Sequence, residues 1–251
     1  MPSFVHSKAS RVAVGAYNLS SITTEAAHQH TVETADTTPL TSSDVTVVAG
    51  RVQHTVSLKG MGDFAALSGD QGAIEGILGS TTRGIVSYLP EGYTVGKQAQ
   101  LMQGTPTAYN RTSPASDVVR FDAALAVTHS TKSDHGTAVK DSNGVVLFYS
   151  AAASTSTQAQ TTVDQSAASA AGYAAHLHVF SGLGGGNVTL QVQHSSNGSA
   201  WSDLTAFTSV TAFQAQRLTS WTAAVKRYVR GAITVANSTA EIEALVTFAR
   251  R

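Results

Sequence analysis

Residues 173–182 (YAAHLHVFSG), 187–210 (NVTLQVQHSSNGSAWSDLTAFTSV), 215–235 (AQRLTSWTAAVKRYVRGAITV) and 240–251 (AEIEALVTFARR) decide the fold class of this chain. Apolar and polar residues alternate along these segments, and Gly, Asn and Ser interrupt them. A period of two is typical of half-buried antiparallel strands. We therefore expect strands at 173–181, 187–194, 201–208, 213–220 merging into 224–235, and 240–249.

The Asn-Gly pair at Asn197-Gly198 lies between two of these segments. This dipeptide favours the positive φ angles of a tight hairpin turn, so we expect it to connect two neighbouring strands.

The first 150 residues show the same strand pattern with one interruption. Extended segments are predicted at 11–15, 27–34, 44–49, 52–59, 84–89, 98–103, 118–128 and 145–149. Residues 27–59 are expected to form long, protruding antiparallel ribbons, with Gly50-Arg51 between two of the strands. From Asp63 to Leu78 the apolar spacing changes to three and four, which predicts one short helix with Asp63 as its N-cap and Gly79 as its C-cap.

A change of composition divides the chain. Residues 151–172 are rich in Ala, Ser and Thr and contain one charged residue, Asp164. Such a segment has little with which to anchor a core, so it is interpreted as an extended linker or a strap. The predicted organisation is a β domain at 1–150, the linker or strap at 151–172, and a smaller C-terminal β domain at 173–251. The fold class is mainly β.

The composition points away from several classes of protein. The 251 residues have a formal net charge of zero, and only 13% are charged, about half the usual share. A weakly charged surface favours a protein that is largely covered by partners. There is no ordinary basic surface for nucleic acid. The absence of cysteine excludes disulfides and thiolate chemistry. No signal peptide or membrane-spanning run is recognised, so we expect no membrane insertion.

Two His-x-His pairs, His28/His30 and His176/His178, are the motifs closest to a metal site. Residues two apart on a strand share a face, so each pair could present two imidazoles to a metal ion. A third ligand cannot be identified from spacing, and packing or surface polarity is the favoured interpretation.

Other motifs also lack the partners that their chemistry requires. The glycine-rich segment 181–188 precedes a predicted strand, whereas phosphate-binding loops open a helix. Residues 141–144 (DSNG) resemble the start of a calcium loop but fit a hairpin turn. Glu241 and Glu243 lack the setting of a glycosidase pair. We therefore expect no enzyme activity, no cofactor, and no catalytic, cofactor-binding or metal-binding residues.

A family resemblance is carried by residues 11–40 (RVAVGAYNLSSITTEAAHQHTVETADTTPL) and 48–63 (VAGRVQHTVSLKGMGD). They are similar to the start of the tail tube, or major tail, proteins of long-tailed bacteriophages. The shared features are the turn Gly15–Ser20, a polar strand from Val32 to Thr38, and Leu58-Lys59-Gly60 followed by Asp63. Segments 176–182, 190–204, 226–234 and 246–251 resemble the C-terminal part of actinobacteriophage-type tail proteins.

This resemblance implies a β-sandwich or barrel with one flanking helix. Copies would join edge to edge into rings that stack into a hollow tube, a passive conduit for DNA ejection. The implied partners are copies of the chain, other tail proteins such as the tape measure and terminator, and DNA passing transiently through the lumen. The implied location is the virion tail, after synthesis in the host bacterial cytoplasm. Residues 27–59 are expected to contribute to the lumen wall or to ring stacking, and residues 150–172 to strap across an adjoining subunit.

Several alternatives stay open. The C-terminal block could belong to a two-lobed subunit that forms pseudo-sixfold rings from three copies, or could decorate the outside of a six-copy ring. The chain could instead be a capsid decoration or head-to-tail completion protein. A third possibility is a carbohydrate-binding β-sandwich for host adsorption, with Tyr173, Trp201 and Trp221 on one face.

Overall fold

A computed structural model describes residues 7–38, 43–63, 69–80, 84–127, 144–150, 158–181, 187–236 and 242–250. The prediction of a mainly β chain with one short helix and a second, smaller β part is confirmed. In chain order the elements are η1 (Ser7–Ala9), β1 (Arg11–Val14), β2 (Tyr17–Asn18), η2 (Leu19–Ser21), β3 (Thr23–Asp36), β4 (Val47–Met61), α1 (Asp70–Ile74), η3 (Glu75–Ile77), β5 (Gly84–Leu89), β6 (Gln98–Thr112), β7 (Arg120–Val127), β8 (Gly144–Ser150), β9 (Gln158–Ala159), β10 (Val163–Asp164), β11 (Tyr173–Ser181), β12 (Asn187–Ser195), β13 (Ser202–Ala206), β14 (Gln214–Ser220), β15 (Tyr228–Ala236) and β16 (Glu243–Arg250).

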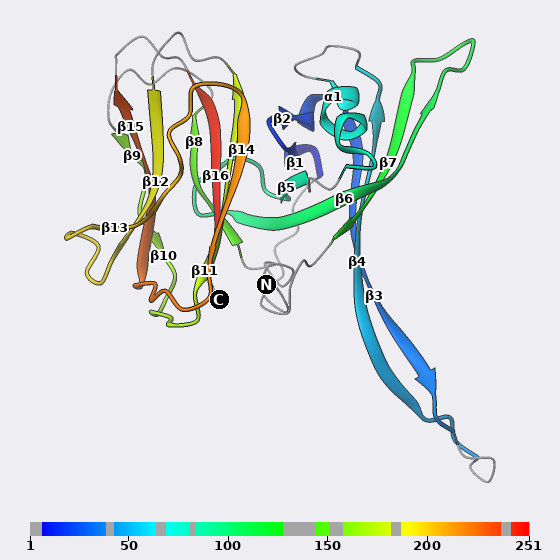
Figure 1. Ribbon diagram of the computed structural model, residues 1–251, viewed down its shortest axis with the longest axis horizontal. Helices are drawn as coiled ribbons and strands as arrows, with labels where there is room; N and C mark the ends of the chain where they lie inside the picture. Colours follow the sequence, from blue (N-terminus) through cyan, green and yellow to red (C-terminus); the bar gives the residue numbers. More distant parts are fainter. Residues whose placement is uncertain are drawn as a thin grey trace.

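The described strands form two sheets. The larger, 11-stranded sheet runs in the order β14-β11-β16-β8-β6-β5-β1-β2, and β7 connects it to β4 and β3. The smaller sheet has the order β10-β15-β12-β13, with β9 also paired to β15. The molecule has two lobes, and the long strand β6 reaches from one to the other (Figure 1).

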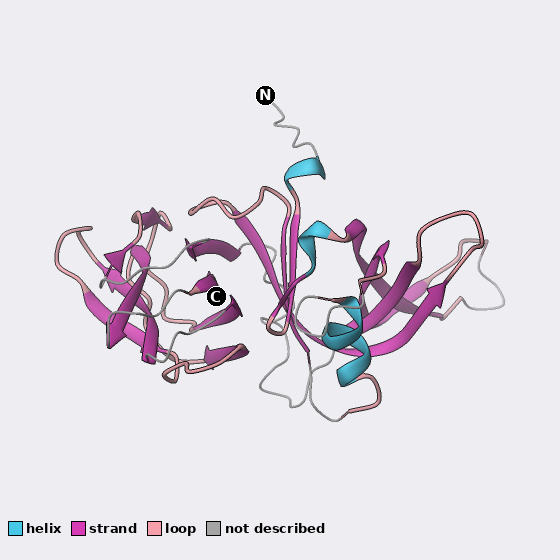
Figure 2. Ribbon diagram, turned by 90° about the horizontal axis from the view of Figure 1, so that it is seen from above, coloured by secondary structure: helices cyan, strands magenta, loops and turns pink. Residues whose placement is uncertain are grey.

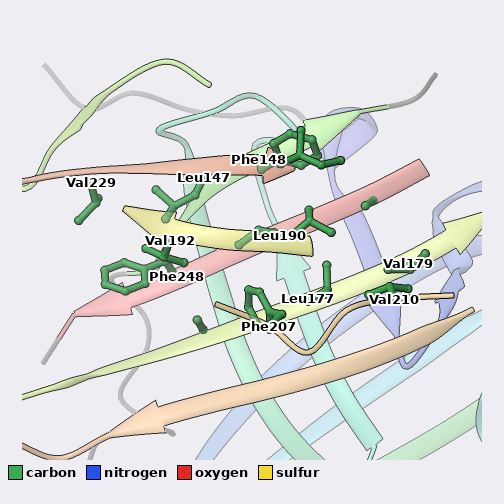
Figure 3. Close-up of a cluster of buried hydrophobic side chains, with 14 of the residues drawn as sticks. Leu147, Phe148, Leu177, Val179, Leu190, Val192, Phe207, Val210, Val229 and Phe248 are labelled. Carbon is green, nitrogen blue, oxygen red and sulfur yellow. The ribbon is translucent and has the colours of Figure 1, made fainter. Parts of the chain in front are cut away.

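The C-terminal lobe is a sandwich of β14, β11, β16 and β8 against the smaller sheet. Its core includes Leu177 and Val179 of β11, Leu190 and Val192 of β12, and Phe248 of β16 (Figure 3). Along β12 the buried side chains alternate with less buried ones, as a period of two predicts. By contrast β11 is buried at every position from Tyr173 to Phe180, because its second face is covered by the other lobe.

The N-terminal lobe packs β1, β4, β5, β6 and β7 with the short helix α1 around a separate core cluster. The helix is shorter than the sequence predicts, since it begins at Asp70 with Gly69 as its N-cap rather than at Asp63. The Asp63 amide instead donates a hydrogen bond to Asp70 Oδ1 at 2.8 Å. At the other end α1 stops at Ile74 with Glu75 as its C-cap, so the prediction of Gly79 as C-cap is wrong; Gly79 instead follows η3, where it takes a φ of 72°. Residues 64–68 lie outside the described residues.

Two connections differ from the sequence prediction. Gly50-Arg51 does not separate two strands, because β4 runs without a break from Val47 to Met61. Residues 213–220 and 224–235 do not merge: β14 pairs with β11 in the larger sheet, while β15 pairs with β12 in the smaller one. The chain crosses between the two layers of the sandwich at this point. A period of two identifies strands but does not say which sheet each joins.

The hairpin predicted at Asn197-Gly198 is present. It connects β12 to β13, with Gly198 at a φ of 75°. The Asn197 Oδ1 accepts hydrogen bonds from the backbone amides of Ser199 and Ala200 at 3.0 and 2.9 Å. The Asn-Gly turn predicted at residues 143–144 falls mostly outside the described residues.

The predicted domain limits near residues 150 and 172 stay predictions. The strands on either side of these limits pair as follows. Strand β8, which precedes residue 151, pairs with β16 of the C-terminal lobe. Within the predicted strap, β9 and β10 pair with β15 of the same chain. Arg227 holds Asp164 there through two hydrogen bonds of 2.8 and 2.6 Å.

Candidate assembly surfaces

A long two-stranded ribbon leaves the N-terminal lobe. Strands β3 and β4 pair antiparallel from Thr23↔Gly60 to Asp36↔Val47, whereas β7 pairs with β4 only as far out as Thr55. Beyond that point the ribbon has no third strand among the described residues, and it projects away from the body (Figure 1). We call residues 29–54 the arm. The sequence prediction of a protruding ribbon in this region agrees with this geometry.

Apolar side chains are exposed on the arm. The exposed fractions are 46% for Val32, 75% for Val45, 57% for Val47 and 56% for Val48. Val47 and Val48 are neighbours on one strand, so they face opposite sides of the ribbon. An isolated two-stranded ribbon is marginally stable in water. Exposed valines on both of its faces are therefore typical of a surface that a partner covers.

The outer end of the arm is ordered by local hydrogen bonds. The Asp36 carboxylate accepts from the hydroxyl and from the backbone amide of Thr38, and these two bonds lower the pKa of Asp36 from its usual value. The Thr37 amide donates to the Thr46 carbonyl at 2.9 Å. The two strands are thus held together as far out as Thr37 and Thr46, which reduces the entropy that this part of the arm loses when it docks.

A second hairpin, β6–β7, projects from the same lobe (Figure 1). At its end Arg120, the first residue of β7, donates to Asp117 of the loop at 2.7 Å in an exposed ion pair. This hydrogen bond is the main reason why the pKa of Asp117 is lowered. The hairpin is anchored by Arg111 and Tyr109, which both donate to the buried Asp70 of α1, Tyr109 at 2.6 Å. This anchor could not be predicted from the sequence, because no motif connects residues 70, 109 and 111.

Several strand edges are open in the described part of the chain. Strand β14 pairs with β11 on one side only, β13 pairs only with β12, and β3 pairs only with β4. An unpaired edge presents backbone N–H and C=O groups that another chain can pair with. Figure 2 shows the sheets of the two lobes and the hairpins from a second direction.

His176 and His178, one of the two predicted His-x-His pairs, are buried between the lobes. The Gly15 carbonyl can only accept, so His178 Nδ1 donates to it at 2.7 Å, and His178 Nε2 accepts from the Ser87 hydroxyl at 2.8 Å. Ser87 Oγ also lies 3.3 Å from His176 Nδ1 and 3.1 Å from Thr247 Oγ1. Burial lowers the pKa of both histidines, that of His178 to about 4. The hydrogen bond between Ser87 and His178 resembles that between a catalytic nucleophile and its base. Neither side chain is exposed, so a substrate could not reach them. The cluster instead joins the two lobes.

The other pair, His28 and His30, lies at the base of the arm. His28 is half-buried, and its Nδ1 donates to the Gln100 side-chain oxygen of β6 at 3.1 Å. Its ring centroid lies 5.9 Å from that of His54 on β4. The strand register places His30 directly opposite His54. His54 was not identified as part of this group from the sequence, because only the strand pairing brings residues 28 and 54 together.

The remaining candidate motifs do not form a site in the described residues. Glu243 accepts from Asn18 and Tyr149, each at 3.3 Å. Glu241, most of the DSNG segment at 141–144 and the glycine-rich residues 182–186 lie outside the described residues. Among the side chains that the structure describes, no three His, Cys or acidic residues are grouped to hold a metal ion. No helix in the described ranges is long and apolar enough to cross a membrane.

The aromatic residues of the carbohydrate hypothesis lie in different surroundings. Tyr173 is buried and stacks against Phe248, with ring centroids 5.8 Å apart. Trp201 is next to β13 of the smaller sheet, where the Arg230 guanidinium lies 4.2 Å from the ring centroid. A sugar-binding platform needs exposed aromatic faces, and Tyr173 does not offer one.

The chain was compared with known proteins. No family model matches it, and neither does any curated protein. Similar solved structures include the tail of an empty gene transfer agent particle, with 15% identity, 43% of this chain and 79% of that chain covered, and a TM-score of 0.35. The PBSX exported protein XepA is 18% identical, with 49% of this chain and 39% of that chain covered and a TM-score of 0.32. The SPP1 Dit protein, from the adsorption apparatus of phages that infect Gram-positive bacteria, is 10% identical, with 95% and 97% covered and a TM-score of 0.33. At scores this low, these similarities carry no functional argument.

Proposed function

We propose that this chain is a structural protein of a bacteriophage tail, and more specifically a tail tube subunit that assembles into stacked rings around a DNA conduit. The role needs no catalytic centre or cofactor. Support comes from the sequence resemblance of residues 11–40 and 48–63 to tail tube proteins and from the surfaces of the chain. The observation that carries the proposal is the arm, a two-stranded ribbon that exposes valines on both faces.

The arm suits contact with another copy of the chain for three reasons. Its outer part pairs with no third strand among the described residues of the same chain, since β7 pairs with β4 only as far out as Thr55. The described outer ends of its two strands are joined in advance by the hydrogen bond from the Thr37 amide to the Thr46 carbonyl. Its apolar side chains would lose their contact with water when a neighbouring subunit covers them, which gains roughly 25 cal/mol per Å².

The open edges supply a second kind of contact. A strand of one copy that pairs with an edge of the next would extend a sheet around a ring and leave fewer unpaired backbone groups. The low share of charged residues favours such burial, because fewer ions have to be desolvated. We propose that residues 151–172 act as a strap between subunits, in addition to the pairing of β9 and β10 with β15.

Deletion of the arm tests the proposal. The wild-type chain is expected to form tubes visible by negative-stain electron microscopy. In the deletion variant, residues 33–51 are replaced by Asn-Gly. Val32 and Val52 face each other in the register, so a two-residue turn can close the shortened hairpin. This variant should remain folded by circular dichroism and should sediment as a species that does not polymerise.

Two results would contradict the proposal. One is a wild-type chain that remains monomeric or trimeric at all concentrations and binds only to capsids, as a decoration or head-to-tail completion protein would. The other is normal tube formation by the folded deletion variant, which would remove the arm from the assembly contacts.

A further inference from the structure

We propose that the outer end of the arm docks, head to tail, into a groove on the body of the next copy of the chain, where Asp36 of the arm pairs with Arg11 of the groove. This inference rests on the proposed self-assembly, and it names the surface that receives the arm. The groove has a volume of about 500 Å³ and is lined by residues of η1, β1, η2, β3 and β5.

The groove and the outer end of the arm lie at opposite ends of the same strand. The first residues of β3, Thr23 to Ala26, line the groove, and the strand ends on the arm at Asp36. At about 3.3 Å per residue, these two ends are roughly 40 Å apart, and β3 runs from the body out along the arm (Figure 1). The arm therefore does not reach the groove of its own chain, whereas a second copy displaced along β3 brings its groove to the end of the arm.

One face of the arm's outer end combines a carboxylate with an apolar side chain. Asp36 is directly opposite Val47 in the ladder between β3 and β4, so the two side chains share a face. Val47 is 57% exposed. Both hydrogen bonds from Thr38 to Asp36 end on Oδ1, so Oδ2 is available to a partner.

The groove offers a positively charged partner for this carboxylate. Arg11 Nη1 donates to the carbonyls of Lys8 and Ser10 at 3.1 and 2.9 Å, which holds the guanidinium in place. Its Nε and Nη2 groups have no acceptor among the described residues, and a guanidinium can donate to a carboxylate through two such groups. Lys8 adds an exposed positive charge to the lining, while the acidic residue there, Glu25, lies 3.7 Å from Lys59.

Apolar side chains line the same groove. Val12 is buried, and Ala26 and Tyr88 are half-buried against the core of the N-terminal lobe. Val47 of a docked arm would lose its contact with water against these side chains. The ion pair would then lie partly removed from solvent, where opposite charges attract more strongly than on an open surface.

The contact joins two different surfaces of identical chains. In a head-to-tail arrangement each copy places its arm on one neighbour and receives the arm of another, so the contact continues from copy to copy. This mode of contact suits subunits that stack into a long polymer.

Engineered cysteines report the contact directly, because the chain has no cysteine of its own. The full-length chain with Val47→Cys and Ser10→Cys, which lies in the groove, should form covalent oligomers larger than a dimer on mild oxidation. Val48→Cys with Ser10→Cys is the matched control, since Val48 is 56% exposed but lies on the opposite face of the arm. A disulfide forms only when the two Cα atoms come within about 7 Å, so the control should not cross-link beyond the level of the single-cysteine variants.

Charge reversal tests the ion pair. Asp36→Arg and Arg11→Asp should each raise the protein concentration required for assembly by about 10-fold or more, because like charges then meet. The double variant should recover most of this loss, since it restores opposite charges. Asp36→Asn keeps an oxygen that accepts from Thr38 and removes the charge, so it should also weaken assembly. Sedimentation velocity measures all four variants, and circular dichroism shows which of them are folded.

Three results would overturn the proposal. The Val47 pair might cross-link no more than the Val48 pair, it might yield dimers only, or the folded double charge variant might assemble no better than the single ones. Cross-linking does not require tubes, so the two proposals fail separately. Tubes without this cross-link would remove the groove as the partner of the arm, whereas cross-linked oligomers that never form tubes would keep the contact and contradict the tube.

Discussion

Ser87 Oγ lies 2.8 Å from His178 Nε2, inside the interface between the two lobes and shielded from solvent. Ser87 comes from β5 and His178 from β11, so this contact joins strands of the two lobes. The Gly15 carbonyl orients the imidazole from its other side at 2.7 Å. A buried polar group without a partner is costly, so this network specifies how the lobes meet.

Ser87→Ala should destabilise the protein. The substitution removes the hydroxyl that His178, His176 and Thr247 share and leaves buried polar atoms without that contact. Leaving such a group unsatisfied costs about 1–3 kcal/mol. Urea denaturation measures the free energy of unfolding, and Ser113→Ala in the exposed β6–β7 loop is a suitable control. Equal stability of the two variants would show that the network contributes little.

Stability should decrease as the pH falls from about 6.5 towards 4. The pKa of His178 is lowered by burial to about 4 in the folded state, whereas the unfolded chain has the ordinary value of 6.5. Between these two pKa values the unfolded state binds more protons than the folded state. The contribution of His178 to the free energy of unfolding is therefore full above pH 6.5 and is lost as the pH falls to about 4. A difference of this size between the folded and unfolded pKa corresponds to on the order of 3 kcal/mol of folding free energy. His176, whose pKa is lowered in the same direction, should add to the effect.

Urea denaturation at a series of pH values checks this prediction. A His178→Gln variant should show a flatter dependence on pH over the same range. Wild-type stability that is constant or rises between pH 6.5 and 4 would argue against a neutral, buried His178.

Arg111→Leu should destabilise the N-terminal lobe by about 3 kcal/mol, because it leaves the Asp70 carboxylate buried without its cation. Asp70 has no exposed side-chain area, and Arg111 Nη2 donates to both of its carboxylate oxygens at 3.1 Å. Arg120→Leu is the comparison, since Arg120 pairs with Asp117 at an exposed position and should change stability little. Thermal denaturation distinguishes the two variants, and equal effects would mean that burial of the pair is unimportant.

Val48→Asp should block self-assembly without unfolding the chain. Val48 is 56% exposed and lies on the arm, so an aspartate there remains solvated in the monomer but would be desolvated in a subunit contact. Sedimentation velocity should show loss of polymers, and circular dichroism should stay unchanged. Thr31→Asp, at an exposed site near the base of the arm, tests whether the effect is confined to the apolar surface.

The sequence alone determined the features that depend on neighbouring residues. The period of two predicted the strands of both lobes, Asn197-Gly198 predicted the β12–β13 hairpin, and residues 27–59 predicted the projecting ribbon. These patterns are local because backbone geometry fixes which side chains share a face and which turn a dipeptide favours.

Only the tertiary structure decided which distant segments meet. It placed β14 and β15 in different sheets, started α1 at Asp70 where Arg111 and Tyr109 donate to its carboxylate, and buried His176 and His178 against Ser87. It also brought His54 beside His28. Strand periodicity is the same whichever partner a strand has, and burial of a polar side chain depends on hydrogen-bond partners far away in the chain, so neither could be obtained from local sequence.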